Sequence, residues 1–260
     1  MQRIIVPAIL VAFYVFPFAC SHSWGQETPS FPSTDWPWWR GQSRDGTASA
    51  DQQPPIKWSE TDNVVWKVAI PGRGHGSAML FGDRVYLATA DDNRKAQLLL
   101  CIDRASGKQV WECVVHQGGF ENTGPRKANQ KASWASSTPA TDGTRLFINF
   151  FNDGAVYTSA ISLKGGILWQ QRLSDYVIHQ GYGSSPAIYK GLVIASADNK
   201  GGGAIVAMNR ETGDVVWRRS RPEKPNYASP AIVTVDGKDQ LVFTGCDLVT
   251  SLDPMTGKEL

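Results

Sequence analysis

From residue 76 onward, apolar residues occur in short runs, and polar residues or glycine separate one run from the next. Short runs rich in β-branched and aromatic side chains are typical of strands rather than of helices. The same order of runs returns at intervals of about 50 residues, which indicates a repeat architecture. This repeat organises most of the chain.

Each repeat unit contains three predicted strands in the same order. A segment of small residues comes first, at 76–82, 136–143, 183–191 and 228–237. A second run follows a glycine-containing turn, as RVYLATA, RLFINFF, LVIASA or QLVFTG, and a third run follows as QLLLCID, VYTSAIS, AIVAMN or LVTSLD. Hydroxyl residues recur at the start of each unit, so we interpret SSTP and GSSP as strand starts rather than as sites of a nucleophile.

A polar turn then leads to a tryptophan. DRASGKQVW (103–111) and NRETGDVVW (209–217) share this pattern, ISLKGGILW (161–169) is a looser copy, and DPMTGKEL (253–260) repeats the turn alone. Asp or Asn can bond its own backbone in such a turn, and glycine supplies the positive φ. The residues that we predict to hold neighbouring units together are Trp66, Trp111, Trp169, Trp217, Gly107, Gly213 and Gly257.

A unit of four short strands that stacks on its neighbours is a propeller blade. We therefore predict an all-β fold, a β-propeller of four-stranded blades with about four blades present in residues 63–260. NVVWKVAI (63–70) carries Trp66 without three strands before it, and we expect it to form an outer strand that completes the last blade of a ring. With an unfinished unit at 253–260, we expect an incomplete ring.

Composition agrees with many strands and tight turns, since the 260 residues include 25 Gly, 15 Pro and 10 Trp. The net charge of +2 comes from 26 basic and 24 acidic side chains that are mixed along the chain, so no basic stripe predicts nucleic-acid binding.

The first residues have the pattern of an export signal. Arg3 precedes an apolar run at 4–19, and small residues follow up to Gly25, so we predict a signal peptide at 1–25 and an N-terminal Trp-rich segment at 26–62. The run is short for a membrane span, and an anchor through lipidation of Cys20 is the alternative that would attach the protein to a membrane. We expect a periplasmic or secreted protein.

The cysteines leave two interpretations open. Cys101 and Cys113 flank the turn at 106–107 on two predicted neighbouring strands, and an oxidising compartment would permit a disulfide between them. Two buried thiols fit the same positions, because the strand register must also bring the two Cα atoms within reach. No spacing predicts a metal site.

The D-x-x-T-G-K-x-x-W pattern of these turns resembles the pyrroloquinoline quinone (PQQ) repeat family, over residues 35–260. The resemblance implies a propeller shared by exported quinoprotein dehydrogenases, of about eight blades, and by non-enzymatic relatives such as the outer-membrane assembly lipoprotein of the β-barrel insertion machinery, of about seven. It implies the fold more than the function.

For the dehydrogenases, the resemblance implies a vicinal Cys-Cys disulfide, a stacked Trp, a Ca²⁺ site and an Asp base. The sequence has no adjacent cysteines and no Ca²⁺-loop spacing, so we predict no cofactor, no metal and no catalytic residue, and keep PQQ and calcium for the quinoprotein alternative.

The residues before the inner strands should surround one mouth of the central channel. As ligand-binding candidates we name Arg73, His75, Trp134, His179, Tyr182, Asn226 and Tyr227. Aromatic and cationic groups there could bind a planar or anionic ligand, and packing on the blade tops is the competing interpretation.

The stretch DWPWWRG (35–41) also has two interpretations, a cap over the base of the ring with Arg40 stacked on an indole, or an exposed segment that binds a partner. We favour the cap. The function hypothesis is a non-catalytic scaffold that binds another protein or a small ligand, and the alternative is a PQQ-dependent oxidoreductase or a fragment of one.

Overall fold

The computed structural model describes residues 26–120, 129 and 131–260, and its regular elements are all β-strands. The first sheet contains β1 (Met79–Phe81), β2 (Arg84–Asp91), β3 (Ala96–Asp103) and β4 (Gln109–Gln117). The second contains β5 (Ala140–Thr141), β6 (Arg145–Asn152), β7 (Ala155–Ser162) and β8 (Ile167–Asp175). The third contains β9 (Ala187–Tyr189), β10 (Leu192–Ser196), β11 (Gly203–Asn209) and β12 (Val215–Arg221), and the fourth contains β13 (Ala231–Val235), β14 (Lys238–Gly245) and β15 (Leu248–Leu252).

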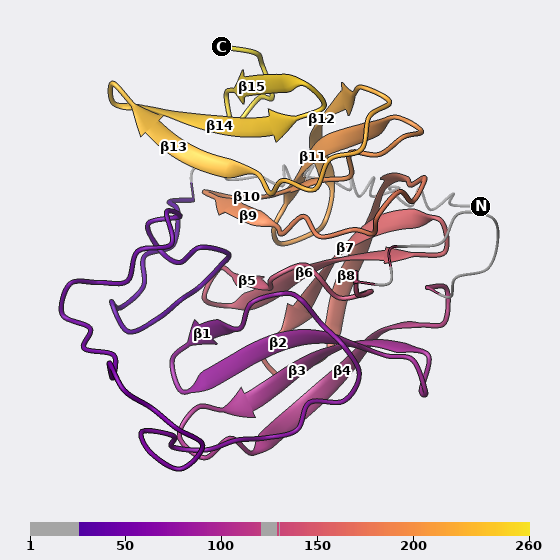
Figure 1. Cartoon of the computed structure of the whole chain (residues 1–260). Helices are drawn as coiled ribbons and strands as arrows, with labels where there is room; N and C mark the ends of the chain where they lie inside the picture. Colours follow the sequence, from indigo (N-terminus) through magenta and orange to yellow (C-terminus); the bar gives the residue numbers. More distant parts are fainter. Residues whose placement is uncertain (1–25, 121–128, 130) are drawn as a thin grey trace, which may run out of the picture.

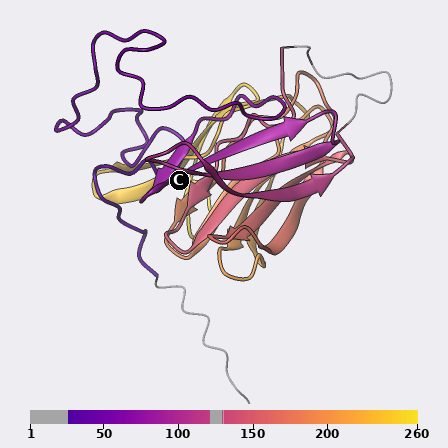
Figure 2. The same ribbon diagram turned by 90° about the horizontal axis from the view of Figure 1, so that it is seen from below.

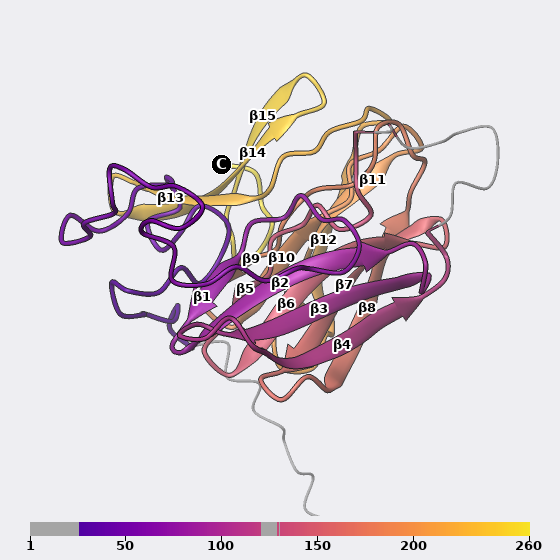
Figure 3. The ribbon, with the colours of Figure 1, turned by 60° about the horizontal axis from the view of Figure 1, so that its bottom comes forward.

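Each sheet is an antiparallel meander in chain order, as predicted for a propeller blade. Figure 1 shows the four sheets stacked face to face from β1–β4 to β13–β15. The middle strands are buried on both faces, because each blade lies between two others; β3 is buried at every position from Ala96 to Ile102. Outer strands such as β4 alternate between exposed and buried residues. The described strands form an open array that does not close into a ring (Figure 3).

Apolar clusters fill the spaces between neighbouring blades. Phe120, Leu146 and Phe150 belong to the layer between the first two blades, and Phe147 and Met208 belong to the layer between the second and third. A third cluster joins the last two blades through residues 189–252. Since an isolated blade would expose both apolar faces, this stacking is the main source of burial.

A tryptophan crosses each of these boundaries and lies against a glycine of the next unit. A Cβ atom added at Gly107, Gly165, Gly213 or Gly257 would approach the indole of Trp66, Trp111, Trp169 or Trp217 to 2.6–3.0 Å. Each indole N–H also donates a hydrogen bond to a carbonyl of the same turn, on Arg104, Leu163, Arg210 and Pro254, at 2.9–3.3 Å. The looser copy at 161–169 therefore makes the same contact as the others.

The turns have the local chemistry that their sequences predict. The carboxylate of Asp253 accepts hydrogen bonds from the backbone N–H groups of Met255 and Thr256 at 2.9 and 2.8 Å, and the side chain of Asn209 does the same for Glu211 and Thr212. Gly257 has a φ of +67°, a region in which a side chain would be strained.

The prediction of a strand at 63–70 is wrong for the described structure, where this segment is irregular. Trp66 still packs on Gly107, and Ile70 covers Ala96, Leu98 and Leu100 on the outer face of the first blade. Valine-rich sequence favours an extended chain, but a strand also needs a neighbouring edge to pair with, and this segment pairs with none.

The cysteine alternatives are resolved by the register. Cys101 pairs with Trp111 and Cys113 pairs with Leu99, so the two cysteines are offset by two positions on β3 and β4. Both are buried free thiols, which agrees with the second of the two interpretations. Cys20 lies outside the described residues.

The first part of the Trp-rich segment lies against the inner strands β1 and β5. Trp36 forms a β-bridge with Leu80 of β1, and the carbonyl of Pro37 accepts a hydrogen bond from the N–H of Thr141 at 2.9 Å. Trp38 is 3% exposed within the second cluster. The guanidinium of Arg40 lies 5.6 Å from the centre of the Trp39 ring. Residues 36–41 therefore cover the inner strands as the cap interpretation expects, while the loop at 47–65 extends away from the blades (Figure 2).

A comparison of Gly213 with Gly154 distinguishes the cost of losing the indole contact from the cost of backbone strain. Gly213 and Gly154 have φ angles of +81° and +70°, but a Cβ would meet the Trp169 ring at 2.8 Å only at Gly213, and nothing within 4 Å at Gly154. We expect Gly154→Ala to lower the free energy of unfolding by about 1 kcal/mol through strain alone, and Gly213→Ala to lower it by about 1–3 kcal/mol more. Urea unfolding of both variants checks this, and equal losses would contradict it.

His116 of β4, at the boundary between the first two blades, should make the free energy of unfolding depend on pH. Its ring packs on Phe150 and Tyr157 of the second blade, its Nε2 has no hydrogen-bond partner in the described structure, and burial lowers its pKa to about 4. Below pH 6.5 the unfolded chain binds a proton that the folded chain does not bind. Stability should therefore fall by up to about 3 kcal/mol as the pH drops from 6.5 to 4.

His116→Phe should remove this part of the slope, measured by urea unfolding at several pH values. The exposed residue His75 supplies the control, since His75→Gln should keep the slope of the unsubstituted chain. An unchanged slope in His116→Phe would refute the assignment.

Candidate functional site

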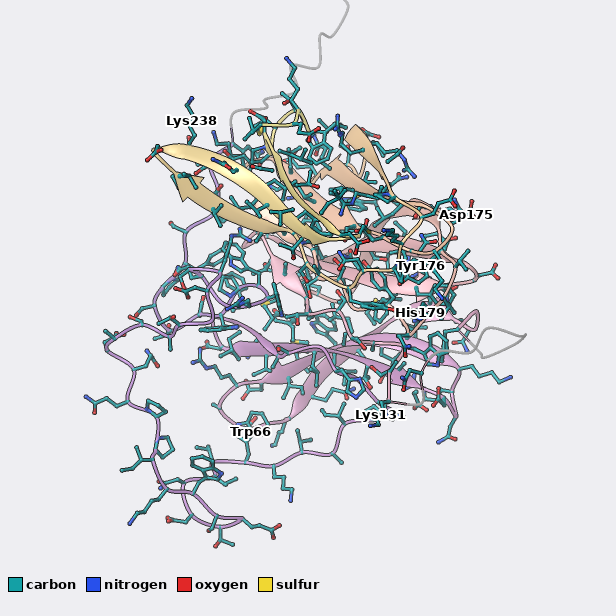
Figure 4. The ribbon with its side chains drawn as sticks, turned by 45° about the horizontal axis from the view of Figure 1, so that its top comes forward. Trp66, Lys131, Asp175, Tyr176, His179 and Lys238 are labelled. Atoms are coloured by element: carbon teal, nitrogen blue, oxygen red, sulfur yellow. The ribbon has the colours of Figure 1, made fainter. Side chains whose placement is uncertain are left out.

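The connections between each outer strand and the next inner strand gather at one end of the blades. In Figure 4, Lys131, Tyr176 and His179 lie toward the same side of the molecule, and Lys238, in the hairpin of β13 and β14, lies far from them. The connections also touch one another, because Asn129 donates from its side-chain amide to the Gln180 side chain at 2.6 Å. This end is where the sequence places the channel mouth.

Arg73 and His75 lie before β1 and are exposed. The backbone of Arg73 pairs with Ala90 of β2, and the N–H of His75 donates to the carbonyl of Ala135 at 3.0 Å. Their backbones therefore fix the path of this connection along the first blade and the start of the second.

Trp134 and Tyr182 are used in packing. The Trp134 ring stacks on Phe151, with 5.8 Å between ring centres and 27° between planes. Tyr182 is 9% exposed, its hydroxyl donates to the carbonyl of Ser196 at 2.8 Å, and burial raises its pKa well above the usual value. Neither ring presents a free face comparable to that of an exposed aromatic residue.

His179 and Tyr227 come together from two successive connections. The Nδ1 of His179 lies 3.0 Å from the hydroxyl of Tyr227, which is 39% exposed. Asn226 points inward instead, and its amide donates to Asp198 at 3.2 Å and to the carbonyl of Thr244 at 2.8 Å. Among the predicted ligand residues, the side chains of His179 and Tyr227 lie within hydrogen-bond distance of each other, with His179 partly exposed and Tyr227 exposed.

The hydroxyl residues that recur before the inner strands form a ladder between blades. The N–H of Ser77 donates to Oγ1 of Thr138, the N–H of Thr138 donates to Oγ of Ser185, and the N–H of Ser185 donates to Oγ of Ser229, each at 2.9 Å. Three equal bonds between equivalent positions explain the repetition of SSTP, GSSP and ASP in structural terms, which agrees with their interpretation as strand starts.

A charged cluster between the last two blades was not anticipated from the sequence. The guanidinium of Arg221 donates from Nε to the carboxylate of Asp198 at 3.1 Å, and their side chains are 4% and 1% exposed. The Cys246 thiol donates to Asp198 as well, at 3.3 Å, and burial and this carboxylate raise its pKa to about 11. The only signal in the sequence is an Arg and an Asp at the ends of two different runs, which does not specify a pair.

The described residues contain neither a metal-binding group nor a membrane-spanning helix. Among residues 26–120, 129 and 131–260, no three His, Cys, Asp or Glu side chains are grouped so that they could hold a metal ion. The same part of the chain contains no helix with the length and apolar character needed to cross a bilayer.

The fold and the repeat define a propeller protein of the PQQ-like class. A family profile described as "Outer membrane protein assembly factor BamB" matches residues 55–129 and 95–260, and the chain belongs to this family.

The related proteins include dehydrogenases and BamB. The chain is 26% identical over 192 residues to 1-butanol dehydrogenase (quinone) of Thauera butanivorans, an alignment that covers 67% of this chain and 29% of that protein. BamB from Moraxella catarrhalis has a TM-score of 0.52 at 18% identity, over 74% of this chain and 52% of that one. Quinohemoprotein alcohol dehydrogenase from Comamonas testosteroni has a TM-score of 0.57 at 16% identity, over 87% of this chain and 40% of that one.

These alignments span about half or less of each relative, and at these identities the solved structures establish the propeller fold alone.

The Asp198–Arg221 pair should be structurally important because both charges are buried. Asp198→Asn leaves the guanidinium without its counter-charge, and we expect a loss of about 3–5 kcal/mol in the free energy of unfolding. The ion pair of Lys224 with Asp247 joins the β12–β13 connection to the β14–β15 turn and is exposed, at 54% and 78%, so Asp247→Asn should cost about 0–1 kcal/mol. Urea unfolding of both variants measures the difference, and similar losses would contradict the prediction.

Proposed function

We propose that this chain is a non-catalytic, exported propeller scaffold that binds another protein. The observation that carries the proposal is the use of the predicted ligand residues in packing: the Trp134 ring stacks on Phe151, the Tyr182 hydroxyl bonds Ser196, and the Asn226 amide bonds Asp198. A ligand that used these three side chains would have to displace contacts within the second and third blades and between the third and fourth. The family description, which names outer-membrane protein assembly, supports a protein partner and a periplasmic location.

The surface that we assign to the partner is the row of aliphatic residues on the outer strands. In the first three units, one or two exposed aliphatic residues lie just before the tryptophan of the outer strand: Val110 at 48%, Ile167 at 43%, Leu168 at 51% and Val215 at 44%. This arrangement repeats from blade to blade along the outer edge. Exposed apolar side chains that recur on neighbouring strands favour a protein-binding surface.

A quinone-dependent oxidoreductase, or part of one, is the second candidate. Its support is the 26% identity with 1-butanol dehydrogenase (quinone) over 192 residues. The sequence has no adjacent cysteines, and the aromatic side chain best placed to stack on a planar cofactor, Trp134, already stacks on Phe151. The scaffold is therefore the better supported of the two.

Titration of the purified chain with PQQ and CaCl₂ separates the two functions. We expect no stoichiometric absorbance band of bound quinone and no reduction of an electron-acceptor dye with 1-butanol. A stoichiometric band, or dye reduction that depends on PQQ, would overturn the scaffold proposal.

A photoreactive residue at Leu168 tests the partner surface in the periplasm of an expressing bacterium. We expect one defined protein adduct from position 168, and none from the control position Lys238 in the β13–β14 hairpin. Equal labelling from both positions would remove the outer-strand surface from the proposal.

A further inference from the structure

A cleft of about 430 Å³ lies in the Trp-rich segment, between residues 33–36 and residues 42–49. Small-molecule sites commonly have volumes of about 300–1,000 Å³, so the cleft has room for a ligand much larger than a single ion or water molecule. Its first wall is attached to the first blade, because the N–H of Gly82 donates to the carboxylate of Asp35 at 3.1 Å and Trp36 pairs with Leu80 of β1. The position of this wall is therefore fixed by the propeller.

The second wall of the cleft is held in shape by hydrogen bonds. The side-chain amide of Gln42 donates to the carbonyl of Phe31 at 2.6 Å. The carboxylate of Asp45 accepts from the Ser43 hydroxyl at 2.5 Å and from the N–H of Thr47 at 2.7 Å. A ligand would therefore meet a wall that is already ordered, which reduces the entropic cost of binding.

The lining of the cleft consists mainly of uncharged polar groups and hydrogen-bond acceptors. Four of its side chains carry a hydroxyl, two carry a carboxylate and one carries an amide, and among the described residues no Lys, Arg or His lines it. Hydrogen bonds from Ser43 and from Thr47 hold the pKa of Asp45 below its usual value, so this carboxylate is an ionised acceptor at neutral pH. An anionic ligand would find no opposite charge in this lining.

Trp36 adds an apolar surface to the polar lining. The residue is partly exposed, and a Cβ atom added at Gly41 would come within 2.7 Å of its six-membered ring. Gly41 has a φ of +73°, a conformation that glycine adopts without strain. The contact with Gly41 therefore holds the indole in one position beside the hydroxyls and carboxylates of the cleft.

We propose that this cleft binds a neutral sugar, with the C–H groups of a sugar ring against the indole of Trp36 and the sugar hydroxyls bonded to Asp45 and its neighbours. Each sugar hydroxyl both donates and accepts, which matches a lining of carboxylates, hydroxyls and an amide. The C–H groups are apolar and match the surface of an indole. No lining residue belongs to the row of aliphatic residues on the outer strands, so the sugar site and the protein-binding surface can fail separately.

Calorimetric titration of the purified chain with cellobiose, maltose and lactose tests the site, and putrescine and sodium gluconate serve as cationic and anionic arms. We expect saturable binding of at least one disaccharide, with the same affinity at low and high salt because the ligand is uncharged. Putrescine and gluconate should bind much more weakly. Absence of binding by all three disaccharides, or tighter binding of either ion, would overturn the proposal.

Asp45→Asn tests the role of the carboxylate. The Oδ1 atom of Asn can still accept the hydrogen bonds from Ser43 and Thr47, while the second carboxylate oxygen is replaced by a donor. We expect disaccharide binding to weaken about 10-fold, because a hydrogen bond to a charged group is lost. Asp62→Asn is the matched control, since Asp62 is an exposed carboxylate of the same segment that does not line the cleft, and its affinity should be unchanged. Equal effects of the two substitutions would contradict the assignment.

Ala48→Trp tests the cleft itself without removing a hydrogen bond. Ala48 lines the cleft and is exposed, so a large side chain there should occupy the space of the ligand and leave the unfolding temperature unchanged. We expect disaccharide binding to be lost. Binding as tight as that of the unsubstituted chain would refute the site.

Discussion

The contact between a tryptophan of one unit and a glycine of the next is the interaction on which the rest of the structure depends. A flat indole can lie on the turn only where no Cβ intervenes, and its N–H bonds a carbonyl of that turn. The contact therefore fixes both the separation and the rotation of neighbouring blades. Because it recurs at Gly165, Gly213 and Gly257, each of the second to fourth blades is aligned on the one before it, and at Gly107 the same contact holds residues 63–70 against the first blade.

Polar contacts also align the blades, at the starts of the inner strands. The hydroxyl ladder from Ser77 to Ser229 joins the starts of the inner strands, and residues 36–44 cross the inner strands of three blades through Leu80, Thr141 and Ile188. The propeller is thus aligned at its periphery by indoles and at its centre by hydrogen bonds.

The functional interpretation depends on which residues remain free once these contacts are made. Aromatic residues near a channel mouth suggest ligand binding in sequence, but burial and bonding have already engaged Trp134 and Tyr182. The accessible apolar side chains are elsewhere, on the outer strands. Because the same fold serves dehydrogenases and assembly proteins, these local features carry the functional argument, and the fold does not.

Much of the fold follows from the sequence because its determinants are local. The second and third strands of each unit lie where their apolar runs predict, and Asp253 and Asn209 close turns with their own backbones. The expected strand at 63–70 does not form, since a strand requires a neighbouring edge that sequence pattern alone does not supply.

The chemistry of the site follows from the sequence to a smaller extent. The choice between a disulfide and two free thiols at Cys101 and Cys113 depended on a register offset of two positions between β3 and β4. The pairing of Asp198 with Arg221 was likewise decided only in three dimensions. The sequence by itself determined the strands, the turns and the blade repeat, because these depend on residues that are close in the chain. The tertiary structure decided which charges are paired and which aromatic faces are free, because burial and pairing depend on residues that only folding brings together.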